Sequence, residues 1–254
     1  MKKILAIIGL AGATLAGAHA QVLLTNGTYS EGFNSLGNAT GSTSLPSGWS
    51  ISNNATTSSL GTLLTTTNQN TWANTASGSR NVASTTGLTS SSTATVQNAA
   101  SNRALGYRQS GSIGDPGAAF VFNFNSTGLT ISTISFDFLT VFPKVRTTTW
   151  LAQVSINGTA WISLTTSPVT ITDSASWGST SVSISTVPTL VDNISSGYFR
   201  LFASGASSGS GKRDTIAIDN FSLTAVPESS TWALIGLGSA FALWNIRRRR
   251  AING

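Results

Sequence analysis

Cysteine is absent from this chain of 254 residues, and histidine occurs only once. Without cysteine the protein has no disulfide framework and no thiolate chemistry. The only histidine, His19, lies in an N-terminal segment that we expect to be removed. A mature chain without histidine has no Ser-His-Asp triad, no His-ligated zinc ion and no histidine general base.

Charged residues are also scarce, at 9% of the chain, although the net charge is +6 and the pI about 10.3. Six of the fourteen basic residues lie at the two ends, in Lys2, Lys3 and the run 247–250. Residues 21–225 hold eight basic and seven acidic side chains, a net charge of about +1. With no basic stripe, this stretch does not favour nucleic-acid binding.

The N-terminus has the three parts of a secretory signal peptide. A basic start, Met1-Lys2-Lys3, is followed by a mostly apolar run from Ile4 to Leu15 and a small-residue cleavage site at Ala18-His19-Ala20. We therefore predict that residues 1–20 form the signal peptide, that signal peptidase removes it, and that the mature chain begins at Gln21.

The C-terminus has a second tripartite pattern. Residues 231–246 carry no charge and would span about 24 Å as a helix, slightly less than the hydrocarbon core of a bilayer. The flanking arginines favour a single transmembrane helix with its C-terminal end in the cytoplasm. Alternatively, these residues form an ordinary C-terminal anchor helix and carry no sorting signal. The motif before the helix and the basic run after it read Val226-Pro227-Glu228-Ser229 and Arg247-Arg248-Arg249-Arg250.

Together, these C-terminal features resemble the PEP-CTERM sorting signal, over residues 226–250. The resemblance implies an exosortase-type processing enzyme, transient anchoring in the inner membrane of a Gram-negative-type bacterium, and cleavage near Pro227-Glu228. Release to the cell surface or extracellular matrix would follow. Ser229 replaces the second proline of the family pattern, and the tail is therefore either cleaved or, where Ser229 prevents recognition, kept as an anchor.

Residues 21–225 predict an all-β domain. Several runs alternate apolar and polar side chains with the period of two that is typical of half-buried strands. Many short strands without a convincing helix indicate a β-sandwich or barrel. The apolar members of three runs are Phe120, Phe122 and Phe124; Ile134, Phe136, Phe138 and Phe142; and Trp150, Ala152, Val154 and Ile156.

Asn157-Gly158 suits a type I′ turn, and residues 160–164 would return as the partner strand of a hairpin. Further strands are expected at 169–172, 181–187, 198–203 and 215–224. The stretch 53–101 is rich in Ser, Thr and Asn, and we expect weak strands joined by long loops there.

Four short segments of this domain resemble jelly-roll domains of secreted bacterial proteins, which are distantly similar to carbohydrate-binding modules. The segments are Tyr29–Leu36, Leu45–Trp49, Ser101–Gly106 and Ile216–Leu223. The resemblance implies a jelly-roll β-sandwich with a structural calcium ion between Glu31 and Asp219. Backbone carbonyls, Asn220 or water would complete its shell. Alternatively, Glu31 is a solvated carboxylate and Asp219 caps a turn or pairs with Arg213.

Aromatic residues offer flat apolar faces for stacking on sugar rings. Trp72 and Trp177 lie in polar loops and are the candidates that we expect to be exposed. Trp150 and Trp161 belong to predicted strands and are expected in the core.

Carboxylates are too few to favour a glycoside hydrolase, which needs two of them across the bond. We therefore expect a non-enzymatic surface or matrix protein associated with extracellular polysaccharide. The alternatives are a carbohydrate-binding module for a defined glycan and, less favoured, a weak hydrolase.

Overall fold

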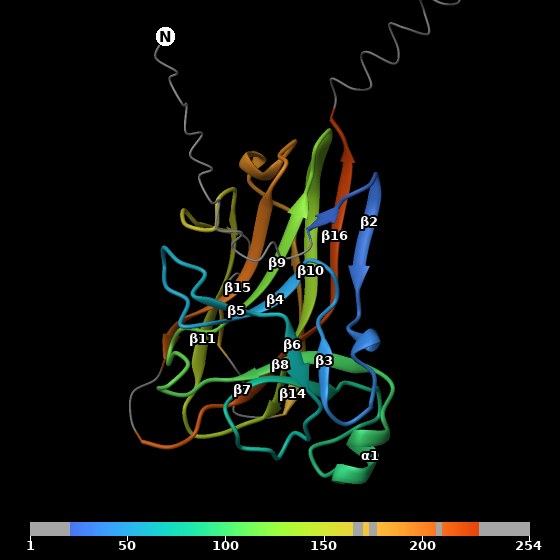
Figure 1. Ribbon diagram of the computed structural model, residues 1–254, viewed down its shortest axis with the longest axis vertical. Coiled ribbons are helices and arrows are strands. Elements are labelled where there is room, and N and C mark those ends of the chain that lie inside the picture. The colour runs from blue at the N-terminus through green and yellow to red at the C-terminus, as the bar shows by residue number, and fades with distance from the viewer. Residues whose placement is uncertain (1–20, 165–169, 173–176, 207–209, 229–254) are drawn as a thin grey trace, which may run out of the picture.

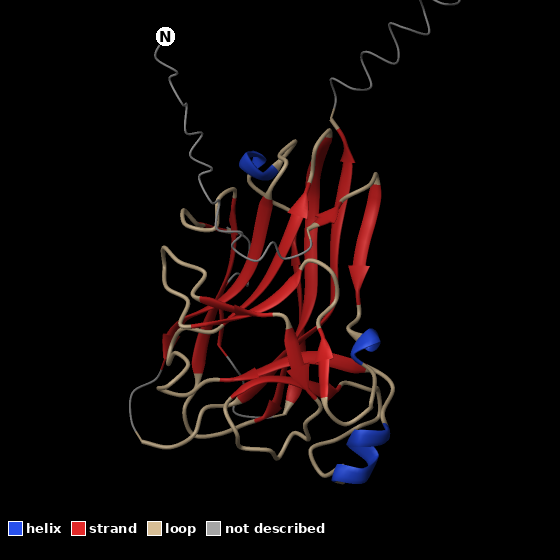
Figure 2. Ribbon diagram, viewed as in Figure 1, coloured by secondary structure: helices blue, strands red, loops and turns tan. Residues whose placement is uncertain are grey.

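The computed structural model describes residues 21–164, 170–172, 177–206 and 210–228. The predicted signal peptide (1–20) and the residues after Glu228 lie outside this range. The described chain forms two β-sheets packed face to face, and helices contribute little (Figure 2). The predicted β-sandwich is therefore confirmed. No helix among the described residues is long and apolar enough to cross a membrane.

The first sheet, sheet A, contains the central strands β11, β15, β9 and β4, paired in that order and all antiparallel. β12 and β13 pair with β11, β5 pairs with β4, and β1 pairs in parallel with β9. The strands are β1 (Val22–Leu23), β4 (Trp49–Asn53), β5 (Thr62–Leu64), β9 (Ala119–Asn125), β11 (Thr148–Ser155), β12 (Ile162–Ser163), β13 (Thr170–Thr172) and β15 (Gly197–Ala206).

The second sheet, sheet B, has the order β14-β10-β16-β8-β7, with β2 also on β16. Its strands are β2 (Gly27–Glu31), β7 (Gly78–Ala83), β8 (Arg103–Arg108), β10 (Leu129–Phe142), β14 (Gly178–Ile184) and β16 (Thr215–Pro227). A small third sheet pairs β3 (Ser42–Ser44) with β6 (Thr66–Asn68). In Figure 1, β9, β10, β15 and β16 run along the long axis, and α1 (Ala94–Ala99) lies at the end away from Pro227. Two 3₁₀ turns complete the elements, η1 (Asn34–Leu36) and η2 (Thr189–Val191).

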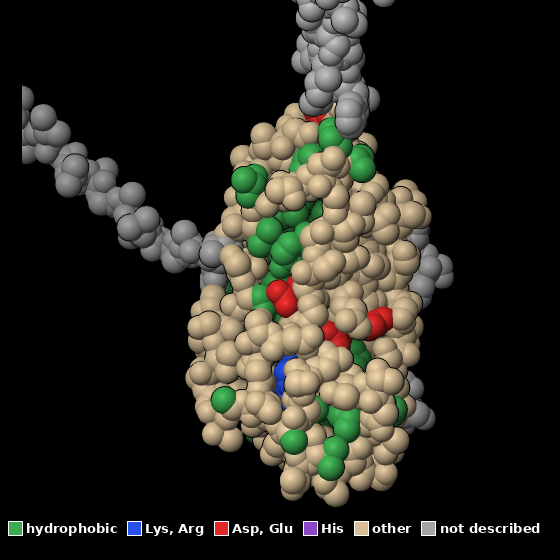
Figure 3. Space-filling model, turned by 90° about the vertical axis from the view of Figure 1, so that its right-hand side faces the viewer, with side chains coloured by type: hydrophobic (Ala, Val, Ile, Leu, Met, Phe, Trp, Pro, Cys, Tyr) green, Lys and Arg blue, Asp and Glu red, His purple; other side chains and the backbone are tan. Residues whose placement is uncertain are grey.

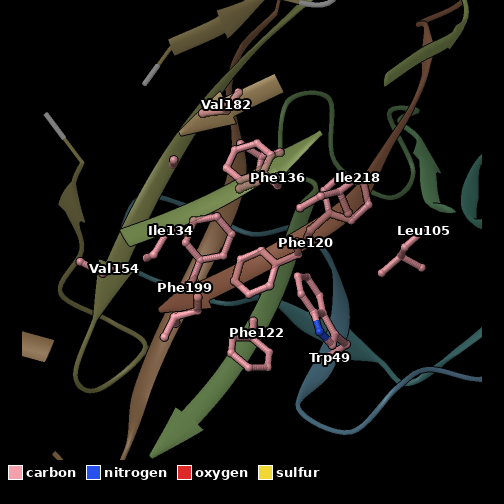
Figure 4. Close-up of a cluster of buried hydrophobic side chains, with 14 of the residues drawn as sticks. Trp49, Leu105, Phe120, Phe122, Ile134, Phe136, Val154, Val182, Phe199 and Ile218 are labelled. Carbon is pink, nitrogen blue, oxygen red and sulfur yellow. The ribbon is translucent and has the colours of Figure 1, made fainter. Parts of the chain in front are cut away.

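The core between the sheets is built from the alternating apolar residues of the long strands (Figure 4). Phe221 of sheet B contacts three rings of sheet A, with centroid distances of 4.9 Å to Trp49, 5.2 Å to Phe122 and 5.3 Å to Phe199. Aromatic pairs at such distances stabilise a fold beyond the area that they bury. Phe221 thus joins β16 to three strands of the opposite sheet.

Three details of the sequence prediction are wrong. The first is the expectation that residues 21–225 hold no helix. Residues 94–99 form one, and the Thr93 side chain caps it by accepting a hydrogen bond from Val96 N–H. The β11–β12 hairpin forms, but only Gly158 has a positive φ, so the turn is not type I′. Asn157 instead accepts hydrogen bonds from Thr159 N–H and Ala160 N–H in a longer loop.

The third wrong detail concerns Phe142, which we expected on the core face of its strand. A register shift between Thr140 and Phe142 turns it away from the main core. Phe142 packs instead against a second apolar cluster, which lies on the outer face of sheet B.

The stretch 53–101 holds β5, β6, β7 and α1 on long loops, close to what its composition predicts. A buried arginine fixes much of it: Arg103 donates from its guanidinium to Asn81 Oδ1 and to the carbonyl oxygens of Asn81, Gln97 and Ala100. Burial lowers the pKa of Arg103 to about 10, so it remains protonated at neutral pH. This one side chain ties β7 to the end of α1.

Arg200 has the same role on the outer face of sheet A. Its guanidinium lies 3.8 Å from the ring centroid of Trp161 and 4.3 Å from that of Phe202. It donates to Gln153 Oε1 and to the carbonyl oxygens of Thr56, Thr57 and Ser59. Trp150 is in the core as expected, whereas Trp161 is half-buried against this arginine.

We expect Arg103→Met to lower the free energy of unfolding by about 3 kcal/mol, because it leaves several buried acceptors without a donor. Urea denaturation measures this change. Lys212→Met, at an exposed position, is the control and should change stability by less than about 0.5 kcal/mol. Equal effects of the two substitutions would contradict a clamping role for Arg103.

Candidate functional site

A pocket of about 330 Å³ lies on the outer face of sheet B. Its floor includes Leu139 and Val141 of β10, and its wall is the loop 84–88 that follows β7. Charged side chains are few on the face of the molecule drawn in Figure 3, where most of the surface is uncharged. The pocket is lined by both charged and aromatic side chains.

Two carboxylates form the polar end of the pocket. Asp137 of β10 and Asp219 of β16 are direct cross-strand partners, and both line the pocket. Ser84 Oγ donates to Asp219 Oδ2 (2.6 Å), and Asn220 N–H donates to Asp219 Oδ1 (2.7 Å). Asn220 Nδ2 donates to Asp137 Oδ2 (2.7 Å), and the Ser181 hydroxyl donates to Asp137 Oδ1. The two acids are thus held in one hydrogen-bonded row.

A β-bulge in β16 places Asp219 on this outer face. Asp137 pairs with Asp219 but Ser135 pairs with Ser222, so β16 contains one extra residue. Asn220 has φ 48°, a left-handed conformation that asparagine tolerates well. The bulge shifts the side-chain alternation, so that Asp219 faces outward while Phe221 enters the core.

Asp219 is almost fully buried, with 2% of its surface exposed. Burial raises the pKa of Asp219 to about 6; the hydrogen bonds from Ser84 and Asn220 lower it, and the charges of Asp137 and Glu31 raise it further. The Asp219 carboxylate is therefore mostly ionised at neutral pH and mostly protonated at pH 5.

Trp72 and Trp177 form the aromatic side of the pocket, with ring centroids 5.5 Å apart. The expectation that Trp72 is exposed is wrong, since only 3% of its surface is exposed. Its Nε1–H donates to Ala83 O (3.0 Å), and it packs with Val82, Val141 and Ala217 in the second apolar cluster. Composition alone did not indicate that this polar loop folds over an apolar sheet face.

Trp177 remains accessible, with 37% of its surface exposed. A second hollow, of about 260 Å³, shares Trp72, Trp177 and Val141 with the first and extends to Phe142 and Pro143. The tryptophan pair therefore lines both hollows.

Glu31 does not line the pocket, although its charge acts on Asp219. It pairs with the inward-facing Phe221, and its Oε1 accepts from Phe33 N–H (2.6 Å). Burial raises the pKa of Glu31, and the hydrogen bond from Phe33 lowers it. Arg213 forms an ion pair with Asp115 rather than with Asp219.

Among the described residues, no three or more Asp, Glu or His side chains lie close enough to hold a metal ion together. Both oxygens of Asp219 already accept hydrogen bonds within the protein. Calcium between Glu31 and Asp219 stays a prediction from the sequence, and it would depend on backbone carbonyls, Asn220 and water.

The two ends of the described chain are both paired with sheet strands. Gln21, the predicted first mature residue, donates from Nε2 to Asn123 Oδ1 (3.1 Å) and to Phe124 O (3.0 Å). At the other end, Val226 and Pro227 pair with Thr130 and Leu129 of β10. The predicted boundary at residue 225 therefore falls inside β16. Ala18, Ala20, Ser229 and Arg247 to Arg250 lie outside the described residues.

Sequence reasoning missed Asp137 as a site residue, although its place between Phe136 and Phe138 puts it on the face opposite to theirs. The alternation of apolar and polar residues predicts the face of the sheet on which Asp137 lies, but it does not predict which residue lies beside it on the next strand. The bulge at Asn220 decides that Asp219 lies beside it, and one asparagine in a strand is too weak a signal to locate a bulge.

No family model matches the chain, and no curated protein matches it. Among solved structures, CBM4 is 17% identical with a TM-score of 0.32, over 49% of this chain and 71% of that one. The K2 cleaved adhesin domain of Lys-gingipain is 11% identical with a TM-score of 0.39, over 78% and 97%. CBM28, a module specific for non-crystalline cellulose, is 13% identical with a TM-score of 0.31, over 48% and 75%. Likenesses this distant carry no argument about a ligand or an activity.

We expect Asp219→Asn to remove a pH dependence of stability. With a pKa of about 6 in the folded state and 3.8 unfolded, Asp219 takes up a proton on folding between these values. The free energy of unfolding should therefore rise as pH falls through about 6 in the wild type, and rise less in the variant. Urea denaturation between about pH 5 and pH 7 measures this. If the free energy of unfolding depends on pH in the same way in both proteins, the raised pKa does not belong to Asp219.

Proposed function

We propose that the chain is an exported, non-enzymatic surface or extracellular-matrix protein that associates with extracellular polysaccharide. The pocket over sheet B would be its contact with the glycan. The observation that carries this proposal is the exposed indole of Trp177 beside a wall that contains Asp137, Asp219 and Asn220.

This combination suits sugars for a physical reason. A sugar ring has an apolar face that can stack on an indole, and a rim of hydroxyls that need hydrogen-bond partners. Ligand pockets commonly combine apolar and aromatic walls with a few fixed polar groups. The Asp137–Asn220–Asp219 row supplies such groups at one end, and Leu139, Val141 and the tryptophan pair supply the apolar part.

We further infer that the sandwich is of jelly-roll type, since the long strands from β9 to β16 alternate between the sheets. β9, β11 and β15 belong to sheet A, whereas β10, β14 and β16 belong to sheet B. A carbohydrate-binding module with a structural calcium ion is the narrower form of the same proposal.

Export is proposed from the two ends of the sequence. The signal peptide would direct the chain across the inner membrane, and the PEP-CTERM-like tail would anchor it there until an exosortase-type enzyme cleaves it. Because β16 continues to Pro227, such cleavage would occur directly beside the folded domain.

A glycoside hydrolase is the second candidate, favoured by the raised pKa of Asp219 beside Asp137, since catalytic acids often have such a pKa. Binding is the better proposal because the two carboxylates lie side by side on neighbouring strands of one wall, rather than across a cleft. Release of reducing sugar that Asp219→Asn abolishes would assign catalysis instead.

We expect Trp177→Ala to weaken glycan binding at least about tenfold, because stacking on an exposed aromatic ring is lost. Affinity electrophoresis in gels that contain polysaccharide, followed by a glycan array, measures the change. Trp177→Tyr should retain part of the affinity. Ile162→Ala, which removes an exposed apolar side chain on sheet A, should have no effect.

No retention of the wild type by any polysaccharide, or equal loss in the Trp177 and Ile162 variants, would refute binding at this pocket. Trp72→Ala does not serve as a binding variant. It removes a buried side chain and should destabilise the fold by about 3–5 kcal/mol.

Processing has its own test, the intact mass of the protein from membrane, surface and medium fractions of its native host. We expect a surface or medium species that begins at Gln21 and ends near Pro227 or Glu228. A species that keeps Arg247–Arg250 and is found only in the membrane would mean a permanent anchor.

A further inference from the structure

The pocket over sheet B has a charge pattern that narrows its ligand. The charged side chains that line it are both acidic, Asp137 and Asp219. Among the described residues, neither lysine nor arginine lines this pocket or the adjoining hollow. A uronic acid or a phosphorylated sugar would therefore enter against like charge, whereas a cationic sugar would be attracted.

Nearby basic side chains do not neutralise these two carboxylates. Arg146 and Arg213 form ion pairs with Asp115. The Arg103 guanidinium donates hydrogen bonds to Asn81 and to two carbonyl oxygens near α1. Lys144 Nζ lies over the Phe142 ring, 3.7 Å from its centroid. The negative charge at the polar end of the pocket is therefore left for a ligand to balance.

Hydrogen-bond capacity points the same way. The donors beside the two carboxylates, which are the Ser84 and Ser181 hydroxyls and the Asn220 amide groups, already donate to them. A carboxylate oxygen has two acceptor sites, so each oxygen can accept one bond more. Hydroxyl groups also line the pocket, among them that of Thr85, which has no hydrogen-bond partner among the described residues. At the two carboxylates the open sites are acceptors, and an ammonium group, with three donors and no acceptor, matches these best.

We infer that this pocket selects a polysaccharide that contains hexosamine with a free, protonated amine. The amine would lie between Asp137 and Asp219, and the apolar face of a sugar ring would pack against Trp177. This inference rests on the proposed function and names the sugar class of that same site. The indoles add a favourable environment for the cation, because a cation is attracted to the face of a tryptophan ring.

Isothermal titration of the purified exported protein with three β-1,4-linked tetrasaccharides tests the inference. They are the tetramers of glucosamine, N-acetylglucosamine and glucose, titrated at about pH 6.5, where Asp219 with its pKa of about 6 is mostly ionised. We expect the glucosamine tetramer to bind at least about fivefold more tightly than the other two, the size of one partly exposed charge pair. Added salt should reduce this preference.

Matched variants separate the two parts of the account. Asp137→Asn and Asp219→Asn should each bring the ratio of glucosamine to glucose affinity close to one, while Trp177→Ala should weaken all ligands by a similar factor. Asp192→Asn, an acid-to-amide change outside the pocket that keeps an acceptor for Ile131 N–H, should leave the ratio unchanged. Thermal melting of each variant confirms that it is folded.

The outcomes are distinguishable. Equal affinity for the glucose and glucosamine tetramers, or a preference that survives both Asp→Asn substitutions, would overturn this inference while the proposed function stands. Loss of the preference when calcium is added would assign the carboxylates to a metal ion and also overturn it. Failure of every saccharide to bind would refute the proposed function itself.

Discussion

The one extra residue in β16, Asn220, is the constraint on which the two sides of sheet B depend. Before the bulge, Ile216 and Ile218 face the core, and Asp219 faces outward toward Asp137. After it, Phe221 and Leu223 face the core again, and Phe221 meets Trp49, Phe122 and Phe199. A regular strand would put either Phe221 in solvent or Asp219 in the core. The bulge lets one strand supply both the aromatic junction of the sandwich and a carboxylate of the pocket.

The absence of cysteine makes a second interaction necessary. Long loops cover the outer faces of both sheets, and buried arginines hold them by donating to backbone carbonyl oxygens. Arg103 fixes the segment around α1, and Arg200 fixes residues 56–59. Such bonds satisfy carbonyl groups that burial would otherwise leave unpaired. The wall of the pocket is part of a loop region that is held in this way, so the geometry of the site depends on cations that never touch it.

Much of the fold could be predicted from the sequence, because period-two alternation marks strands whatever their partners. Phe120, Phe122 and Phe124 are in the core as expected, and the expected runs that begin near Tyr198 and Thr215 are β15 and β16. The site was predicted less well. Trp72 is buried and Asp137 was overlooked, since both outcomes depend on which loop covers which face and on strand register. Trp177 and Asp219 were chosen for separate reasons, yet they line the same pocket.

The most direct test of the account is an NMR titration that follows the indole N–H signals with the glucosamine tetramer as ligand. The account predicts that the signals of Trp177 and Trp72 shift with saturable dependence on concentration. Those of Trp49 and Trp150, buried between the sheets, and of Trp161, on the outer face of sheet A, should stay in place. Shifts at Trp161 without any at Trp177 would place binding on the wrong sheet, and no shift at any indole would contradict the pocket as a sugar site.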